Sequence, residues 1–194
     1  MENIFKLRSH LIIWVLVLFS VPELLAKTAT DSITVYIFMR EDCKICQNYN
    51  LEWQKLHEAY SNDSIRFVGV FPNFSSKPKK IKAFKEKYQI PFEFVHDYFK
   101  TLTLRFGATV TPEVVVFNHN EGKVLYKGRT DNSYFRVGKR RTVTTTSELE
   151  DALKAIKNGQ PIAVPETTAV GCFCLLYTSP SPRDRTRSRM PSSA

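Results

Sequence analysis

Residues 33–46 read ITVYIFMREDCKIC, and this stretch decides the fold. Its first seven residues are mostly β-branched or aromatic, which predicts a buried strand. Two cysteines, Cys43 and Cys46, follow shortly afterwards. Apolar side chains then recur at near-helical spacing over residues 43–60, which predicts a helix that begins at the cysteines, with Asp42 as its N-cap. A strand, a pair of cysteines and a helix therefore follow one another directly.

The rest of the chain alternates between strands and helices and then forms a strand pair. Apolar runs predict the strands, and apolar residues at helical spacing predict the helices. In order, we expect a strand at 65–71, a helix that opens at Pro78, a strand at 92–95, a helix capped by Asp97 and ending at Phe106, a hairpin of 113–118 with 123–128, and a helix at 147–158. This order predicts an α/β fold with a mixed central sheet flanked by helices on both faces.

The first 26 residues have the order of a secretory signal. Lys6 and Arg8 precede an apolar run within residues 11–21, and the small residue Ala26 offers a cleavage point. If it stays uncleaved, the segment 11–21 would tether the protein to a membrane. We therefore expect the protein to be exported, either to a periplasm or to the outer face of a membrane, where disulfides persist.

One domain is expected over residues 31–160, followed by a linker at 161–173 that contains Cys172. Residues 174–194 are rich in Ser, Pro and Arg, which predicts disorder. The sequence of these residues also resembles translated sequencing-adapter read-through. The formal net charge is +9, and this tail contributes four arginines against one aspartate. The remaining basic residues are spread along the chain, so we interpret them as a basic surface and expect no nucleic-acid partner.

Cys43 and Cys46 are candidates for a redox-active dithiol. At the N-terminus of a helix, unpaired backbone amides and the helix dipole stabilise a thiolate, so we expect Cys43 to be the nucleophile. Cys46 lies almost one turn further on and can attack a mixed disulfide to release the reduced substrate. Lys44 would favour the thiolate, whereas Glu41 and Asp42 would oppose it.

Zinc sites use the same cysteine spacing, so a structural zinc site is an alternative. It would need Cys172 and Cys174 as the other two ligands, and the Cys-x-Cys spacing is less usual for that metal. A purely structural disulfide within so short a loop would constrain little of the unfolded chain. We favour redox chemistry and expect neither a metal nor another cofactor.

Thr111 and Pro112 stand directly before the strand expected at 113–118. With them the chain resembles the thioredoxin superfamily, and within it the exported TlpA/ResA-like and AhpC/TSA-like redoxins. Three features match in order: the strand, CxxC and helix; an extra αβ segment at about 77–95; and Thr-Pro before a strand hairpin. The resemblance covers about residues 31–160 and implies a thioredoxin-like fold with an αβ insertion.

The resemblance also implies roles for individual residues. Pro112 would be the family's cis-proline beside the dithiol, and the backbone of Thr111 would pair with substrate. Thioredoxins carry a buried Asp six residues before the first cysteine, where this chain has Ile37. Glu113 could substitute for that Asp, but we favour its being an ordinary surface or strand-end carboxylate. Apart from the resemblance, Cys172 is a further accessory candidate: it is either a third redox thiol or merely a terminal cysteine.

These observations predict a thiol–disulfide oxidoreductase that exchanges disulfides with exported proteins through Cys43 and Cys46. Its partners would be protein thiols and disulfides, and a redox partner that the sequence does not identify. One alternative is a thiol peroxidase, but peroxiredoxins need Pro-x-x-x-Thr-x-x-Cys, and the positions before Cys43 hold Tyr36 and Arg40. Another is a metal-binding redoxin; copper carriers of this fold use CxxxC and a distal His, whereas the spacing here is CxxC.

Overall fold

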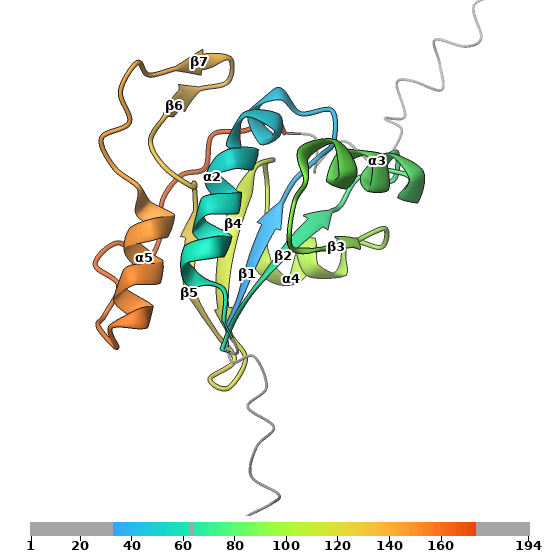
Figure 1. The fold of residues 1–194 in the computed structure, drawn as a ribbon. Helices are drawn as coiled ribbons and strands as arrows, with labels where there is room; N and C mark the ends of the chain where they lie inside the picture. The colour runs from blue at the N-terminus through green and yellow to red at the C-terminus, as the bar shows by residue number, and fades with distance from the viewer. Residues whose placement is uncertain (1–32, 63, 174–194) are drawn as a thin grey trace, which may run out of the picture. The chain divides into compact units, whose positions relative to one another are not determined.

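A five-stranded mixed sheet lies at the centre of the computed structural model, which describes residues 33–62 and 64–173 (Figure 1). Its strand order is β3-β2-β1-β4-β5. The strands are β1 (Ile33–Phe38), β2 (Ile65–Phe71), β3 (Glu93–His96), β4 (Glu113–Asn118) and β5 (Lys123–Gly128). β1, β2 and β3 are parallel, whereas β4 pairs antiparallel with both β1 and β5. The predicted mixed sheet and its late hairpin are thus confirmed.

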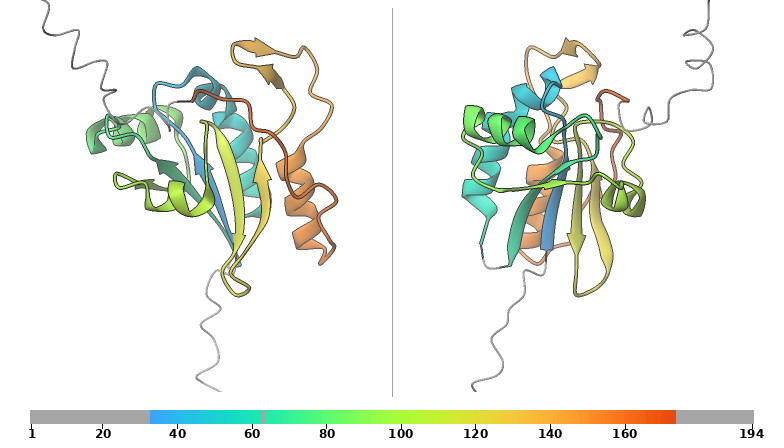
Figure 2. Two further views of the ribbon diagram at one scale, coloured as in Figure 1. Left: turned by 180° about the vertical axis from the view of Figure 1, so that it is seen from behind. Right: turned by 90° about the vertical axis from the view of Figure 1, so that its right-hand side faces the viewer.

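Helices cover both faces of the sheet (Figure 2). Those that contribute to the larger buried cluster are α2 (Lys44–Tyr60), α3 (Pro78–Tyr88) and α5 (Glu148–Lys157), whereas α4 (Thr101–Phe106) packs on the opposite face. Alternation along a strand decides which face a side chain joins. In β4, Val114 and Val116 join the cluster of α2, while Val115 and Phe117 join that of α4. The α/β class with helices on both faces is confirmed.

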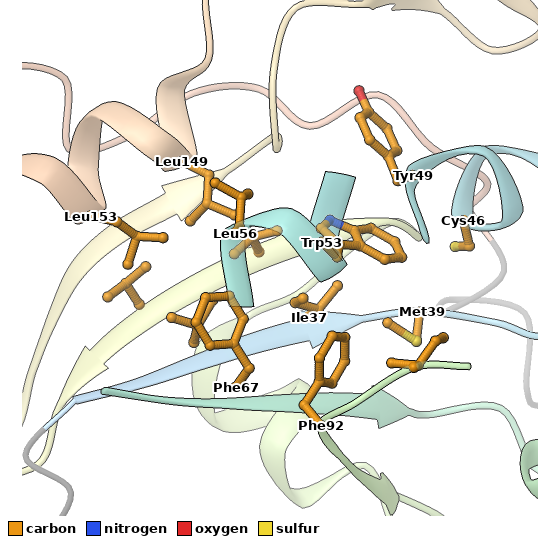
Figure 3. Close-up of a cluster of buried hydrophobic side chains, with 14 of the residues drawn as sticks. Ile37, Met39, Cys46, Tyr49, Trp53, Leu56, Phe67, Phe92, Leu149 and Leu153 are labelled. Carbon is orange, nitrogen blue, oxygen red and sulfur yellow. The ribbon is translucent and has the colours of Figure 1, made fainter. Parts of the chain in front are cut away.

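Trp53 of α2 anchors the larger cluster, shown in Figure 3. Its side chain is fully buried and stacks on Tyr49 of the same helix, with 5.6 Å between the ring centroids. Leu149 and Leu153 bring α5 against it, and Cys46 lies at the end of the cluster nearest the start of α2. The dithiol helix is therefore fixed to the sheet by its buried aromatic side chains.

Two helix starts differ from the predictions. Cys43 rather than Asp42 is the N-cap of α2, because the carboxylate of Asp42 forms an ion pair with Arg40 at 2.5 Å. Similarly, Lys100 rather than Asp97 is the N-cap of α4. The Asp97 carboxylate still serves this helix start, since its Oδ2 accepts a hydrogen bond from the backbone N–H of Thr103 at 2.9 Å.

A two-stranded ribbon was not predicted: β6 (Tyr134–Arg136) pairs with β7 (Lys139–Arg140) between β5 and α5. The two strands are only three and two residues long, so neither the apolar alternation nor the length of an ordinary strand marks them in the sequence.

Residues 161–173, predicted to be a linker, follow α5 back along the sheet. The backbone N–H of Lys127 in β5 donates to the carbonyl of Pro165 at 2.9 Å, and that of Thr167 donates to the carbonyl of Lys127 at 2.9 Å. Glu166 thus forms a parallel bridge with Lys127 on the outer edge of β5. The signal predicted for residues 1–26 and the tail 174–194 lie outside the described residues. Within those described residues, no helix is long and apolar enough to cross a membrane.

Candidate functional site

Cys43 and Cys46 lie where the chain passes from β1 into α2. The backbone N–H of Met39 still pairs with Val70 of β2, after which a short turn leads to Cys43 at the N-cap of the helix. Cys43 is 5% exposed and Cys46 is fully buried, so Cys43 is the more accessible sulfur. Both side chains, and that of Cys172, are thiols in this structure.

The surroundings of Cys43 favour its thiolate. A hydrogen bond from the Cys46 side chain contributes most and, against the opposing effect of burial, lowers the pKa of Cys43 to about 6. Backbone amides of Cys46 and Ile45 and the side chain of Cys172 act in the same direction. The amides are those that a helix start leaves without an intrahelical partner. Lys44 is exposed and is not among these causes.

Thr111 lies beside Cys43, and the peptide bond between Thr111 and Pro112 is cis. The Sγ of Cys43 is 3.6 Å from the carbonyl oxygen of Thr111, a contact in which the thiol donates. Thr111 is fully buried. The structure thus brings Thr111 to Cys43, from which it is separated by 68 residues in the sequence.

Glu113 does not reach the dithiol. Its position in β4 alternates with Val114, which faces α2, so its side chain lies on the other face of the sheet. There its Oε2 accepts a hydrogen bond from the backbone N–H of Thr109 at 2.7 Å, and its Oε1 is 3.8 Å from Nζ of Lys127. The buried carboxylate therefore holds the loop that leads to Thr111. Ile37, at the position of the buried Asp of thioredoxins, lies in the core on the dithiol face.

Cys172 completes the site from the far end of the chain. Its Sγ lies 4.0 Å from the Sγ of Cys43. Its backbone pairs with Thr111 on both sides: the N–H of Thr111 donates to the carbonyl of Cys172 at 3.0 Å, and the N–H of Cys172 donates to the carbonyl of Thr111 at 2.8 Å. The backbone groups that the resemblance assigns to a substrate are thus used by the chain's own C-terminal segment.

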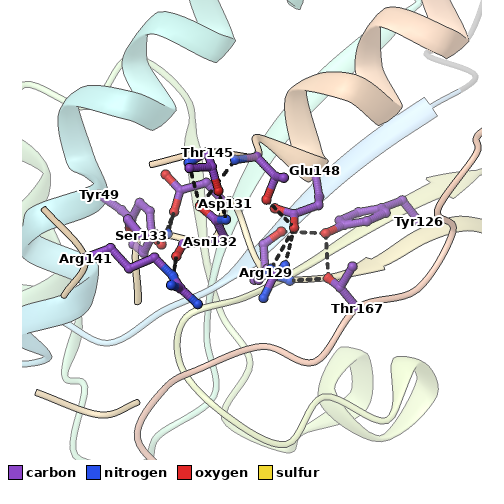
Figure 4. A network of polar contacts seen from close by, with 11 residues as sticks. Tyr49, Tyr126, Arg129, Asp131, Asn132, Ser133, Arg141, Thr145, Glu148 and Thr167 are labelled. Atoms are coloured by element: carbon purple, nitrogen blue, oxygen red, sulfur yellow. Dashed lines mark hydrogen bonds and ion pairs between the residues drawn. The ribbon is translucent and has the colours of Figure 1, made fainter. Parts of the chain in front are cut away.

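A polar network that contacts α2 through Tyr49 was not predicted from the sequence (Figure 4). The Tyr49 hydroxyl donates to Asp131 at 2.6 Å and contacts Ser133 at 2.8 Å, and Trp53 donates to Thr130 at 3.0 Å. Burial and the neighbouring carboxylate raise the pKa of Tyr49 far above its ordinary value. The only signal in the sequence is the polar run TDNS at residues 130–133, which reads as a surface loop but folds onto α2.

The second half of this network fixes the C-terminal segment. Thr167 Oγ1 accepts from the backbone N–H of Arg129 at 3.1 Å and lies 2.9 Å from the Tyr126 hydroxyl. The guanidinium of Arg129 donates from Nε to Glu148 at 2.9 Å (Figure 4). Gly128 faces Thr167 so closely that a Cβ built there would lie 2.1 Å from Thr167 Oγ1. The segment is therefore seated against β5 before it reaches the dithiol.

Among the residues that the structure describes, no group of three or more His, Cys, Asp and Glu side chains is arranged to hold a metal ion. The zinc alternative also involves Cys174, which lies outside the described residues.

Comparisons with known proteins give the fold and a family. The model of the AhpC/TSA family matches residues 23–145, whereas no curated protein matches the chain. An uncharacterized conserved protein from Geobacillus kaustophilus aligns at a TM-score of 0.66 and 22% identity, covering 80% of this chain and 83% of its own. A hypothetical protein from Sinorhizobium meliloti 1021 aligns at a TM-score of 0.66 and 16% identity, covering 78% of this chain and 83% of its own. A secreted Mycobacterium tuberculosis disulfide oxidoreductase aligns at a TM-score of 0.47 and 17% identity, covering 66% of this chain and 84% of its own. The fold is thioredoxin-like, as the sequence predicts.

Proposed function

The chain belongs to the AhpC/TSA family, and from this premise we propose that it is a thiol–disulfide oxidoreductase whose dithiol is Cys43 and Cys46. The observation that carries the proposal is the environment of Cys43. Its sulfur has a pKa lowered to about 6, and a second thiol lies close enough to hydrogen-bond to it. A thiolate is the nucleophile in disulfide exchange, and a neighbouring thiol resolves the intermediate.

The proposed reaction has two exchange steps. The thiolate of Cys43 attacks one sulfur of a client disulfide, a mixed disulfide forms, and the other client sulfur leaves as a thiolate that takes up a proton. Cys46 then loses its proton and attacks the Cys43 sulfur. The mixed disulfide breaks, the client leaves with both sulfurs reduced, and the two electrons come from the dithiol, which ends as the Cys43–Cys46 disulfide. The reverse sequence would oxidise a client.

A thiol peroxidase is the second candidate, because the family name covers peroxidases as well as redoxins. Peroxide cleavage needs donors that hold the O–O bond in line with the sulfur. At the positions where the peroxidase motif has Thr and Pro, this chain has Arg40 and Tyr36. The Arg40 guanidinium is paired with Asp42, and Tyr36 lies in the cluster on the α4 face of the sheet. These observations favour disulfide exchange.

We also propose that the protein acts outside the cytoplasm, on the thiols and disulfides of exported proteins. Support comes from the signal-like order of residues 1–26 and from the persistence of disulfides in oxidising compartments. N-terminal sequencing of the protein recovered from a fractionated cell tests this. A cleaved chain that begins near residue 27 in the exported fraction supports it, and a full-length chain in the cytosol contradicts it.

The test of the activity compares disulfide reduction with peroxide reduction in the same preparations. Reduced wild-type protein should reduce insulin disulfides, Cys43→Ser should lose this activity, and the double variant Cys46→Ser/Cys172→Ser, which lacks both thiols near Cys43, should accumulate mixed disulfides on Cys43. Peroxide should oxidise Cys43 at about the rate of an ordinary thiolate. Oxidation faster by about a thousandfold, equivalent to about 4 kcal/mol of barrier, would replace the proposal with the peroxidase.

A further inference from the structure

The C-terminal segment brings a third sulfur to the dithiol by a specific backbone register. Cys172 forms an antiparallel bridge with Thr111, and both residues exchange N–H···O bonds across it. In such a pair the facing side chains are fixed relative to the partner strand. The register places the Cys172 sulfur 4.0 Å from Cys43, about 2 Å more than a disulfide bond. A rotation of the side chains, rather than a movement of the backbone, is of the size needed to close that gap.

The approach of this segment depends on Gly171. A Cβ built on Gly171 would lie 2.3 Å from the carbonyl oxygen of Thr111 and 3.0 Å from the backbone nitrogen of Pro112. Real Cβ atoms do not come so close to backbone atoms, so only glycine fits between Val170 and Cys172 at this position. Val170 and Cys172 both pack against the main core, whereas Phe173 is exposed.

The segment is held in place upstream as well as at Thr111. Thr167 is bonded to β5 through its backbone and through its hydroxyl. The segment is thus anchored at Thr167 and again at Cys172, which pairs with Thr111, and only residues 168–171 lie between these two anchors. Cys172 therefore meets Cys43 at a high effective concentration. An unanchored tail would bring its thiol there only rarely.

We infer that Cys172 is a third redox-active thiol and that it exchanges with Cys43 to form a Cys43–Cys172 disulfide inside the protein. This inference rests on the proposed function, and it makes Cys172 of the same chain a substrate of the dithiol. In the oxidised protein, the Cys172 thiolate attacks Cys43. The Cys43–Cys172 bond forms, the Cys43–Cys46 bond breaks, and Cys46 leaves as a thiolate that takes up the proton lost by Cys172. No electrons enter or leave, so no external oxidant or reductant is required.

The pairing has a consequence for external clients. Both backbone groups of Thr111 are used by Cys172. A client strand that pairs with Thr111 must therefore displace residues around Gly171, and with them the thiol that faces Cys43. The Cys43–Cys172 disulfide can therefore form only while no client strand is paired with Thr111.

The test uses the full chain carrying Cys46→Ser and Cys174→Ser, so that Cys43 and Cys172 are the cysteines left. It is equilibrated with oxidised and reduced glutathione at millimolar concentration, quenched with acid, alkylated and digested with trypsin. Cleavage after Arg40 and Lys44 releases Cys43 on the peptide 41–44, and Cys172 is on a peptide that begins at residue 158. Mass spectrometry then distinguishes a Cys43–Cys172 link from a glutathione adduct on Cys43.

We expect the internal link to exceed the glutathione adduct by at least about a hundredfold, because groups held in position react at effective concentrations well above millimolar. Gly171→Ala in the same background should lower this ratio by at least about tenfold, and Phe173→Ala, at an exposed neighbouring position, should leave it unchanged. A glutathione adduct on Cys43 with Cys172 still a thiol would overturn the inference. The proposed function would fail differently: protein with Cys43 and Cys46 intact would not form or exchange their disulfide, whether or not residue 172 is cysteine.

Discussion

Replacing Cys46 with alanine should raise the pKa of Cys43. The hydrogen bond from the Cys46 side chain is the largest of the causes that lower this pKa to about 6. A hydrogen bond to a charged group is worth about 1.5–3 kcal/mol, which corresponds to about one to two pKa units. At pH 6 the thiolate fraction of Cys43 should therefore fall from about one half to between about 1% and 9%.

Alkylation of the reduced protein by iodoacetamide measures this change directly. Because trypsin cleaves after Lys44, Cys43 and Cys46 appear on separate peptides and the label on Cys43 is read alone. The wild-type rate should follow a titration curve with its midpoint near pH 6. For Cys46→Ala the midpoint should rise by about one to two units, so the rate at pH 6 should fall by about 5- to 50-fold and the plateau at high pH should persist.

Cys46→Ser is the matched control, because its hydroxyl is also a hydrogen-bond donor of similar size. Its midpoint should stay closer to the wild-type value than that of the alanine variant. A wild-type midpoint near 8.5, the value of an ordinary thiol, would refute the reasoning. So would equal midpoints for wild type and Cys46→Ala.

Three further outcomes follow from the same contacts. In the reduced protein, the pKa of Cys43 is lower in the folded than in the unfolded state, so its thiolate adds to the free energy of unfolding. Measured by urea titration relative to Cys43→Ala, this contribution should grow as the pH rises from about 6 to about 8.5 and should be absent below pH 6. Trp53→Ala should cost about 3–5 kcal/mol of unfolding free energy, since it empties a fully buried site in the core; a loss below about 1 kcal/mol would contradict that packing. Glu113→Gln should cost about 1–3 kcal/mol by weakening the acceptor for Thr109, and amide hydrogen exchange at Thr109 should accelerate.

The regular part of the fold could be predicted from local patterns. The run at residues 33–38 is buried along its whole length, and a strand between two parallel or antiparallel neighbours needs such continuous apolar character. The hairpin of β4 and β5 follows from two apolar runs separated by a short turn. The start of α2 was misplaced by one residue, because Asp42 pairs with Arg40 instead of capping.

The contacts that complete the site could not be predicted in this way. The bridge between Thr111 and Cys172 joins distant parts of the chain, and the residues around Cys172 have neither helical spacing nor apolar alternation. The sequence could therefore offer Cys172 as a candidate third redox thiol, but it could not place that thiol beside Cys43. For Glu113, the sequence placed a carboxylate next to Pro112, but only the alternation of β4 shows that it faces away from the dithiol.

The most direct test of the central claim is a redox titration of the dithiol. The wild-type protein is equilibrated across a series of glutathione redox buffers, quenched with acid, and analysed by mass spectrometry for a link between the peptide 41–44 and the peptide that begins at Ile45. A reversible Cys43–Cys46 disulfide should appear with the slope of a two-electron couple, about 30 mV for each tenfold change in the ratio of oxidised to reduced protein. If Cys43 and Cys46 stay as thiols or carry only separate glutathione adducts across the whole series, the account is contradicted.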